Sequence, residues 1–173
     1  MRDNVLDHIP FALFSLEHLV QLRLDSNKIT CIPNQIAKWT ALQGLSMVEN
    51  ELENLPTNFS CLVSLITLDL SKNKLRILPS YAIHNMTQLK SLCIAKNRLQ
   101  SIPQNIGCLT NLTDLNLMYN NLKYLPPSLG NCKSLSNLFL HTNTLLECLP
   151  KSIQWYQLKK LDVHNTALIA IPD

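Results

Sequence analysis

The sequence is poor in charge of either sign and has no long apolar run. Its 173 residues include 15 Lys and Arg and 12 Asp and Glu, so the formal net charge is only +3. The two signs are interleaved along the chain, and we expect no basic stripe of the kind that binds a phosphate backbone. No stretch approaches the ~20 apolar residues that span a bilayer. We therefore expect no nucleic-acid partner and no membrane span.

Glycine and aromatic residues are also scarce. The chain has three Gly, and aromatic residues make up 6% of it. We find no Gly-rich phosphate loop, no paired-carboxylate motif and no supported arrangement of Ser, His and Asp. The sequence therefore predicts that the chain is not an enzyme, needs no cofactor and has no small-molecule substrate. With so little glycine, the turns are expected to depend on Asn and Pro.

One pattern recurs along nearly the whole chain. The motif LxxLxLxxNxL starts at seven positions, 23 or 24 residues apart: Leu19, Leu42, Leu65, Leu89, Leu112, Leu135 and Leu158. Such a period is typical of leucine-rich repeats, in which each unit buries its apolar face against the next. No linker or change of composition interrupts the pattern. We predict a single domain over 1–173, with a partial repeat at 1–18, full repeats starting at 19, 42, 65, 89, 112 and 135, and a truncated repeat at 158–173.

The motif predicts an α/β-type repeat solenoid, a leucine-rich repeat horseshoe. In each LxL segment the leucines would point inward and the intervening residues outward, as in a short strand. Stacking these strands gives a parallel sheet on the concave face. An apolar residue and a proline follow in each repeat, and proline favours an extended or short helical return on the convex face. Neither end has the polar cap that covers a last apolar layer, so we expect the segment to belong to a longer array.

An asparagine follows the predicted strand in each of the first six full repeats. Its amide carries both donors and an acceptor, and stacked copies would satisfy backbone groups that the turn otherwise leaves unpaired. Losing one such partner costs roughly 1–3 kcal/mol. The predicted structural ladder consists of Asn27, Asn50, Asn73, Asn97, Asn120 and Asn143.

The six cysteines indicate reduced thiols. Only Cys61 and Cys108 share a repeat position, and they lie two repeats apart. That separation is at least ~10 Å at sheet spacing, beyond the ~7 Å between Cα atoms that a disulfide tolerates. Asp3 and Asp7 also make the first residues unlike a secretory signal. Because free thiols are typical of a reducing compartment, we expect a cytoplasmic location, with the nucleus as a second compartment.

Outward positions on and just after the strands are the candidate protein-binding residues, because repeat solenoids bind through the concave face. They are Arg23, Asp25, Glu49, Asp69, Lys96, Asn116, Met118, Tyr119, Phe139, His141, Asp162 and His164. Aromatic, Met and His side chains gather in the last three repeats, as they do in binding hot spots. An alternative is that Phe139 packs on Met118 and only covers the sheet.

The pair of histidines in adjacent repeats also allows a metal-binding interpretation. His141 and His164, with Asp162 alongside, could supply two imidazoles and one carboxylate to a transition metal. Such histidines are more often plain surface or interface residues. We therefore predict no metal site.

The repeats resemble the Ras-group leucine-rich repeats of intracellular proteins. The segments that carry the resemblance are MRDNVLDHIPFALFS at the start, IPQNIGCLTNLTDLNL from Ile102 and LHTNTLLECLP from Leu140. The last has one extra residue between Asn143 and Pro150 and one fewer before Leu158, which is similar to the penultimate repeat of the Shoc/Sur-type (suppressor-of-clear) Ras–Raf scaffold family. On this alignment the chain resembles the C-terminal half of that family.

The resemblance implies a scaffold in intracellular signal transduction. Members of the family bind Ras-type GTPases and the catalytic subunit of protein phosphatase 1 on the concave face, and the complex acts on Raf kinases in the MAP-kinase pathway. We therefore expect protein partners of these two kinds. Two other functions stay open: the ligand-binding repeat region of a receptor or adhesion protein, and a targeting domain attached to an enzyme outside this segment.

Overall fold

A computed structural model describes residues 4–153 and 155–171. The predicted partial repeats extend over 1–3 and 172–173 as well, and those positions lie outside the described residues. The strands are β1 (Gln21–Arg23), β2 (Gly44–Ser46), β3 (Thr67–Asp69), β4 (Ser91–Cys93), β5 (Asp114–Asn116), β6 (Asn137–Phe139) and β7 (Lys160–Asp162). The helical segments are η1 (Phe11–Ser15), η2 (Asn34–Lys38), η3 (Thr57–Cys61), α1 (Ser80–Ile83), η4 (Gln104–Cys108), η5 (Pro127–Asn131) and η6 (Trp155–Gln157), where η marks a 3-10 helix.

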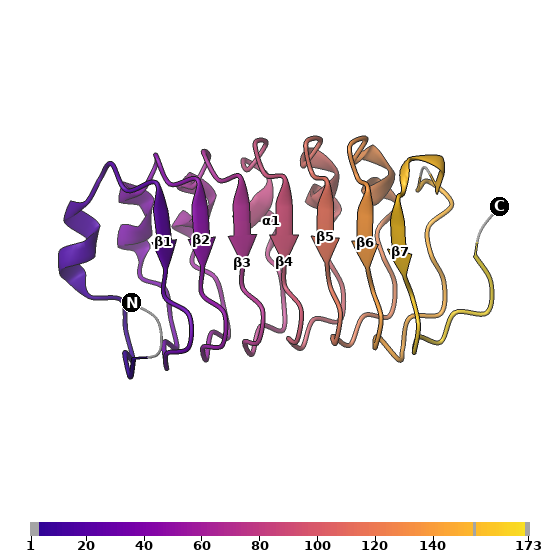
Figure 1. The fold of residues 1–173 in the computed structure, drawn as a ribbon, viewed down its shortest axis with the longest axis horizontal. Coiled ribbons are helices and arrows are strands. Elements are labelled where there is room, and N and C mark those ends of the chain that lie inside the picture. The colour runs from indigo at the N-terminus through magenta and orange to yellow at the C-terminus, as the bar shows by residue number, and fades with distance from the viewer. Residues whose placement is uncertain (1–3, 154, 172–173) are drawn as a thin grey trace.

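The strands form one parallel sheet in chain order, with one strand from each repeat. Its order over the described residues is β1-β2-β3-β4-β5-β6-β7. Equivalent leucines pair directly, for example Leu22 with Leu45 and Leu45 with Leu68. The helical segments lie behind the sheet, so the strands line one face of the solenoid and the returns line the other (Figure 1). The predicted leucine-rich repeat solenoid is confirmed.

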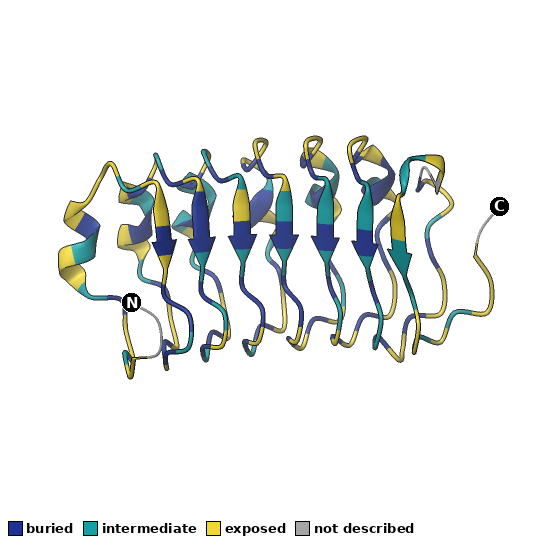
Figure 2. Cartoon of the chain, in the orientation of Figure 1, coloured by how far each residue is buried: buried dark blue, intermediate teal, exposed yellow. Residues whose placement is uncertain are grey.

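The core is a continuous column of inward side chains between these two layers. The middle leucine of each strand from β1 to β6 is buried, whereas the burial of β7 is only partial (Figure 2). Behind the sheet, the second apolar pair of the repeat, such as Ile36 and Trp39, is fully buried. Trp39 stacks on Phe14 with the ring centroids 4.8 Å apart, and its Nε1 donates to the carbonyl of Leu13 (3.1 Å). Each repeat thus packs on the next both through its strand leucine and through the apolar pair behind the sheet.

The returns begin at the predicted prolines. Pro33, Pro56 and Pro103 each precede a five-residue 3-10 helix in extended backbone geometry. The repeat that starts at Leu65 is one residue longer than the others, and its return is the short α-helix α1. No helix within residues 4–153 and 155–171 is both long and apolar enough to cross a bilayer.

The ladder asparagines each join two repeats through one amide. Asn97 Oδ1 accepts a hydrogen bond from the backbone N–H of Leu75 in the preceding repeat (3.0 Å). Its Nδ2 donates to the carbonyl of Leu70, also in that repeat (3.0 Å), and to the carbonyl of Ile94 in its own (3.2 Å). The same bonds recur at Asn50, Asn73, Asn120 and Asn143. All six ladder side chains are buried.

The turns after the strands are held by the ladder asparagines, as expected, but a different residue in each turn adopts an unusual backbone conformation. The residue just before each ladder position has a φ of 53–60°, and these residues are Ser26, Glu49, Lys72, Lys96, Tyr119, Thr142 and Asn165. Only one of the seven is an asparagine, and none is a glycine. A left-handed conformation costs an ordinary residue roughly 1–2 kcal/mol. The ladder bonds and the backbone bonds to the next repeat, such as Lys72 N–H to the carbonyl of Ala95 (2.8 Å), hold the turn in this strained geometry.

We predict that Asn97→Ala lowers the free energy of unfolding more than Lys96→Ala does. The first change leaves buried backbone groups unpaired, at about 1–3 kcal/mol, whereas the second changes an exposed side chain, usually within about 0.5 kcal/mol. Urea unfolding of both variants measures the difference. Equal midpoints would contradict the role given to the ladder.

We also predict that Thr142→Gly raises the free energy of unfolding by about 0.5–1 kcal/mol, because it relieves left-handed strain at a β-branched residue. Thr144→Gly is the matched control. Thr144 is exposed and has no positive φ, so glycine there adds only backbone entropy and should lower stability by about 0.5–1 kcal/mol. Melting temperatures that shift in the same direction for both variants would show that the left-handed turn is not strained.

Candidate protein-binding face

The outward side chains of the strands form rows that run across the sheet, and we call this surface the strand face. Parallel register places equivalent residues of adjacent repeats side by side, about 4.8 Å apart. Asn116, Phe139 and Asp162 are such neighbours on β5, β6 and β7. The twelve candidate residues therefore occupy three rows. Nine of them lie on the strands or directly after them, while Glu49, Lys96 and Tyr119 belong to the row of left-handed turns at the strand ends.

The first four strands line a polar hollow of about 580 Å³. Arg23, Asp25 and Asp69 contribute to its wall, together with the small side chains of Ser46 and Ser91. Cys93 closes one side of the hollow. Burial raises the pKa of the Cys93 thiol, so it stays protonated at neutral pH. The hollow thus offers hydrogen-bonding groups and two carboxylates, and no reactive thiolate.

Four of the candidate side chains also accept hydrogen bonds from backbone N–H groups just beyond the strands. Asp69 Oδ1 accepts from the N–H of Ser71 (2.9 Å), and Asn116 Oδ1 accepts in the same way from Met118 (3.2 Å). Asp162 Oδ1 does so for His164 (3.3 Å).

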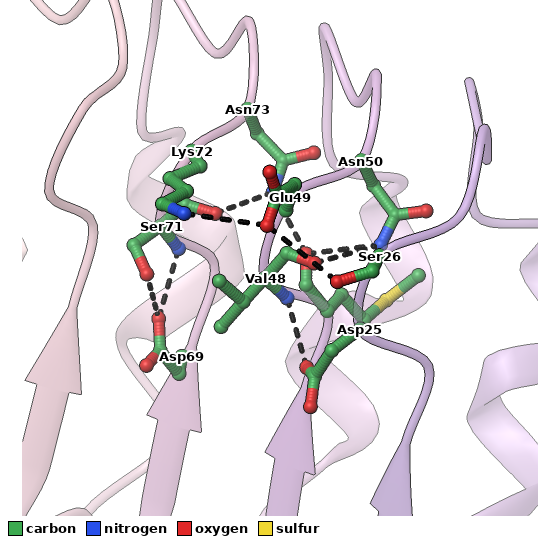
Figure 3. Close-up of polar contacts among 10 residues, drawn as sticks. Asp25, Ser26, Val48, Glu49, Asn50, Asp69, Ser71, Lys72 and Asn73 are labelled. Atoms are coloured by element: carbon green, nitrogen blue, oxygen red, sulfur yellow. Dashed lines mark hydrogen bonds and ion pairs between the residues drawn. The ribbon is translucent and has the colours of Figure 1, made fainter. Parts of the chain in front are cut away.

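Asp25 reaches across to the next repeat and accepts from the N–H of Val48 (3.0 Å, Figure 3). The strand-side carbonyl before Asp25, that of Leu24, is taken by Asn50 Nδ2 (2.9 Å). The ladder amides thus occupy backbone carbonyls at the end of each strand, and side-chain oxygens such as that of Asp25 satisfy the backbone N–H groups that remain there. These carboxylates and this amide therefore serve the fold.

The last repeats carry a chain of stacked rings. Lys96 Nζ lies 5.1 Å from the centre of the Tyr119 ring, a cation–π contact. Tyr119 meets His141 edge to face, with centroids 5.0 Å apart and an interplanar angle of 80°. His141 in turn stacks on His164 at 4.3 Å and 12°. We call Tyr119, His141 and His164 the ring stack. It crosses three repeats and remains accessible, since Tyr119 is 45% exposed.

Phe139 lies apart from the ring stack. It is half-buried on β6, level with Asn116 and Asp162. Met118 is also half-buried and occupies the same row as His141. The predicted cluster of Met118, Tyr119, Phe139, His141 and His164 is therefore divided among the three rows. The structure brings the tyrosine and the two histidines together, and Phe139 and Met118 form the surface beside them.

The histidine pair is held by hydrogen bonds at one edge. His164 Nδ1 lies 2.6 Å from Asp162 Oδ1, and His141 Nδ1 lies 3.1 Å from Thr142 Oγ1. Burial raises the pKa of Asp162, but the hydrogen bonds and positive charge of His164 outweigh it and lower the pKa overall. The carboxylate is therefore ionised at neutral pH. Among the described residues, no group of three His, Cys, Asp or Glu side chains has a geometry that could hold a metal ion.

Four members of the row of left-handed turns were not predicted from the sequence. They are Ser26, Lys72, Thr142 and Asn165. Lys72 Nζ forms an ion pair with Glu49 Oε2 (3.2 Å), and Ser26 Oγ lies 3.5 Å from the same oxygen (Figure 3). Their common position directly before the ladder residue was the signal in the sequence. Without the positive φ, nothing indicated that these side chains turn outward together.

Comparisons with known proteins agree with the architecture. A family model described as "Leucine-rich repeat region" matches residues 2–117, and one described as "Leucine Rich Repeat" matches residues 111–132. Human leucine-rich repeat-containing protein 7 is 41% identical over 61 residues, which are 35% of this chain and 4% of that protein.

Two solved structures are similar over nearly the whole chain. A leucine-rich repeat protein of Leptospira interrogans has a TM-score of 0.76 and 31% identity, over 98% of this chain and 49% of that one. The repeat ectodomain of the Arabidopsis thaliana receptor kinase GASSHO1/SCHENGEN3, in complex with CASPARIAN STRIP INTEGRITY FACTOR 2, has a TM-score of 0.79 and 36% identity, over 92% and 20%. The chain thus spans about half or less of each of these three proteins. It belongs to the leucine-rich repeat family, and it is a protein-binding scaffold of that family.

Proposed function

We propose that the strand face holds a protein partner in intracellular signal transduction, in the Ras/MAP-kinase pathway. The partner would be a Ras-type GTPase, the catalytic subunit of protein phosphatase 1, or both. The location would be the cytoplasm, with the nucleus as a second compartment. The choice of pathway rests on the resemblance of segments such as IPQNIGCLTNLTDLNL to the Ras-group scaffold family.

The ring stack is the observation that carries the choice of surface. Its rings are already ordered by contacts at 4.3 and 5.0 Å, so little side-chain entropy remains to be lost on binding. Aromatic side chains that are fixed and accessible are typical anchors of protein interfaces. Lys96 adds a positive charge at one end and Asp162 a negative charge at the other. This pattern selects a partner with complementary charge on both sides of an apolar centre.

The cysteines support an intracellular setting. All six are free thiols, and Cys31, Cys108 and Cys148 are exposed. Exposed free thiols are typical of reducing compartments. The second candidate function is the ligand-binding repeat region of a receptor or adhesion protein, which the likeness to the GASSHO1/SCHENGEN3 ectodomain favours. That function would use the same strand face in an oxidising compartment.

We predict that the double substitution Phe139→Ala with His141→Ala weakens partner binding by about 2 kcal/mol or more, because it removes two neighbouring anchors from one strand. Isothermal titration of GTP-loaded Ras, and separately of the phosphatase catalytic subunit, measures the effect. Gln104→Ala, at an exposed position on the opposite face in η4, is the control and should bind normally. Loss of binding in the control with none in the double variant would place the site on the other face. Failure of both proteins to bind the unsubstituted chain would overturn the proposed pathway.

A further inference from the structure

A second polar surface lies beyond the strand ends, and we call it the strand-end surface. It comprises the outward side chains of 26–30, 49–53, 72–76, 96–100 and 119–123. In each segment the burial alternates, so that the first, third and fifth residues point outward while the ladder asparagine and the next leucine or isoleucine are buried. Backbone bonds between repeats, such as Arg98 N–H to the carbonyl of Leu75 (2.8 Å), keep the segments in register. The outward residues therefore form a regular grid.

Two adjacent segments of this grid have opposite charge, and on this surface we call the outward residues of one segment a row. One row is Glu49, Glu51 and Glu53, and the next is Lys72, Lys74 and Arg76. Lys72 pairs with Glu49 (3.2 Å) and Lys74 with Glu51 (2.8 Å). The hydrogen bond from Lys74 and its charge lower the pKa of Glu51, so this carboxylate is ionised at neutral pH. An extended segment with acidic residues at alternate positions is thus the natural complement of a basic row.

The basic residues beyond these two ion pairs have no such complement. Arg76, Lys96, Arg98 and Lys123 are exposed, and none forms an ion pair within the described part of the chain. We call these four residues the cationic patch. Between Leu55 and Leu146 the only acidic residues are Asp69 and Asp114, which lie on strands β3 and β5. The expected interleaving of charges along the sequence therefore does not extend to this surface.

Two exposed apolar side chains border the cationic patch. Ile77, directly after Arg76, is 65% exposed, and Tyr124, directly after Lys123, is 55% exposed. Both belong to the same position of the repeat and lie two repeats apart. An exposed aromatic residue beside unpaired cations is a common composition of a protein interface, where Tyr and Arg are enriched.

The geometry points to a docking site for an acidic, extended segment of a partner protein on the cationic patch. Lys96 and Arg98 are alternate, exposed residues of one segment, separated by the buried Asn97. Carboxylates at alternate positions of an extended partner, about 6.6 Å apart, would likewise lie on one side of that partner. The chain already pairs the row of Glu49 and Glu51 with basic residues in this way. This site shares only Lys96 with the candidate residues of the strand face and does not depend on the pathway proposed above.

The surroundings favour a short acidic segment over a long polyanion. The cationic patch covers three repeats, a width of only about 10 Å at sheet spacing. The row of Glu49, Glu51 and Glu53 lies beside it and would repel a nucleic acid or an anionic bilayer that extended further. Each phosphate contact of a nucleic acid needs its own cation, and these four residues allow only a few.

The test uses a fluorescent eight-residue peptide of alternating Glu and Thr, and its analogue with Gln in place of Glu. Fluorescence anisotropy is measured with the whole chain and with the variant Lys96→Gln/Arg98→Gln. The acidic peptide should bind and the Gln analogue should not. Loss of two exposed charge pairs should weaken binding about tenfold, and the weakened affinity should depend less on salt.

The control variant is Lys90→Gln/Lys133→Gln, which removes the same charge from exposed positions outside the cationic patch. If both variants weakened peptide binding equally, net charge alone would explain the effect, and the inference would be overturned. Binding of single-stranded oligothymidine or of phosphatidylserine vesicles through the patch without binding of the peptide would also overturn it. The variant Phe139→Ala/His141→Ala should bind the peptide normally, and a loss there would assign the peptide to the strand face instead.

Discussion

Each ladder asparagine ties a turn to the repeat before it, and most features of the molecule follow from that bond. The amide of Asn97 takes the carbonyl of Leu70 and supplies an acceptor to Leu75. Because Nδ2 takes the carbonyl of Leu70, no backbone N–H can pair with that carbonyl, and side chains such as Asp69 satisfy the N–H groups that are left over at this position of the repeat. The residue before the ladder position is left-handed in all seven repeats, including Asn165 before Thr166. The ladder bond thus accounts for the carboxylate contacts, and it holds in place a turn that is common to every repeat.

The sequence was sufficient to predict the fold because the position of a residue in the repeat determines whether its side chain is buried. Leu68 and Leu92 occupy identical environments in identical register, so one reading of the motif applies to every copy. The one longer repeat was visible in the spacing, but its replacement of a 3-10 return by α1 was not. That choice depends on how one extra residue is accommodated between fixed neighbours, which is a property of the packed stack.

The candidate site was predicted less completely, because it depends on contacts between repeats. Position in the motif was enough to nominate His141 and His164, yet not to show that they stack at 4.3 Å. Nor did it show that Asp25 would be buried while serving a neighbouring N–H. Ion pairs such as that of Glu51 with Lys74 join residues 23 positions apart. The order of charged residues along the sequence therefore does not show which charges lie side by side in the stack of repeats.

One departure from the ladder bears on how binding and stability are connected. In the seventh repeat the ladder position is held by Thr166, whose hydroxyl donates within its own repeat to the carbonyl of Val163 (2.7 Å). The junction between the last two repeats therefore lacks the buried ladder amide of the others, and strand pairing, the stacked histidines and an exposed contact from Asn165 Nδ2 to Thr142 Oγ1 (3.4 Å) hold it together. Local opening at this seam costs less free energy than opening elsewhere in the stack. His141 and His164 lie on opposite sides of the seam, so a ligand that covers both closes it. By mass action, such a ligand would protect the seventh repeat from hydrogen exchange and proteolysis in proportion to its concentration.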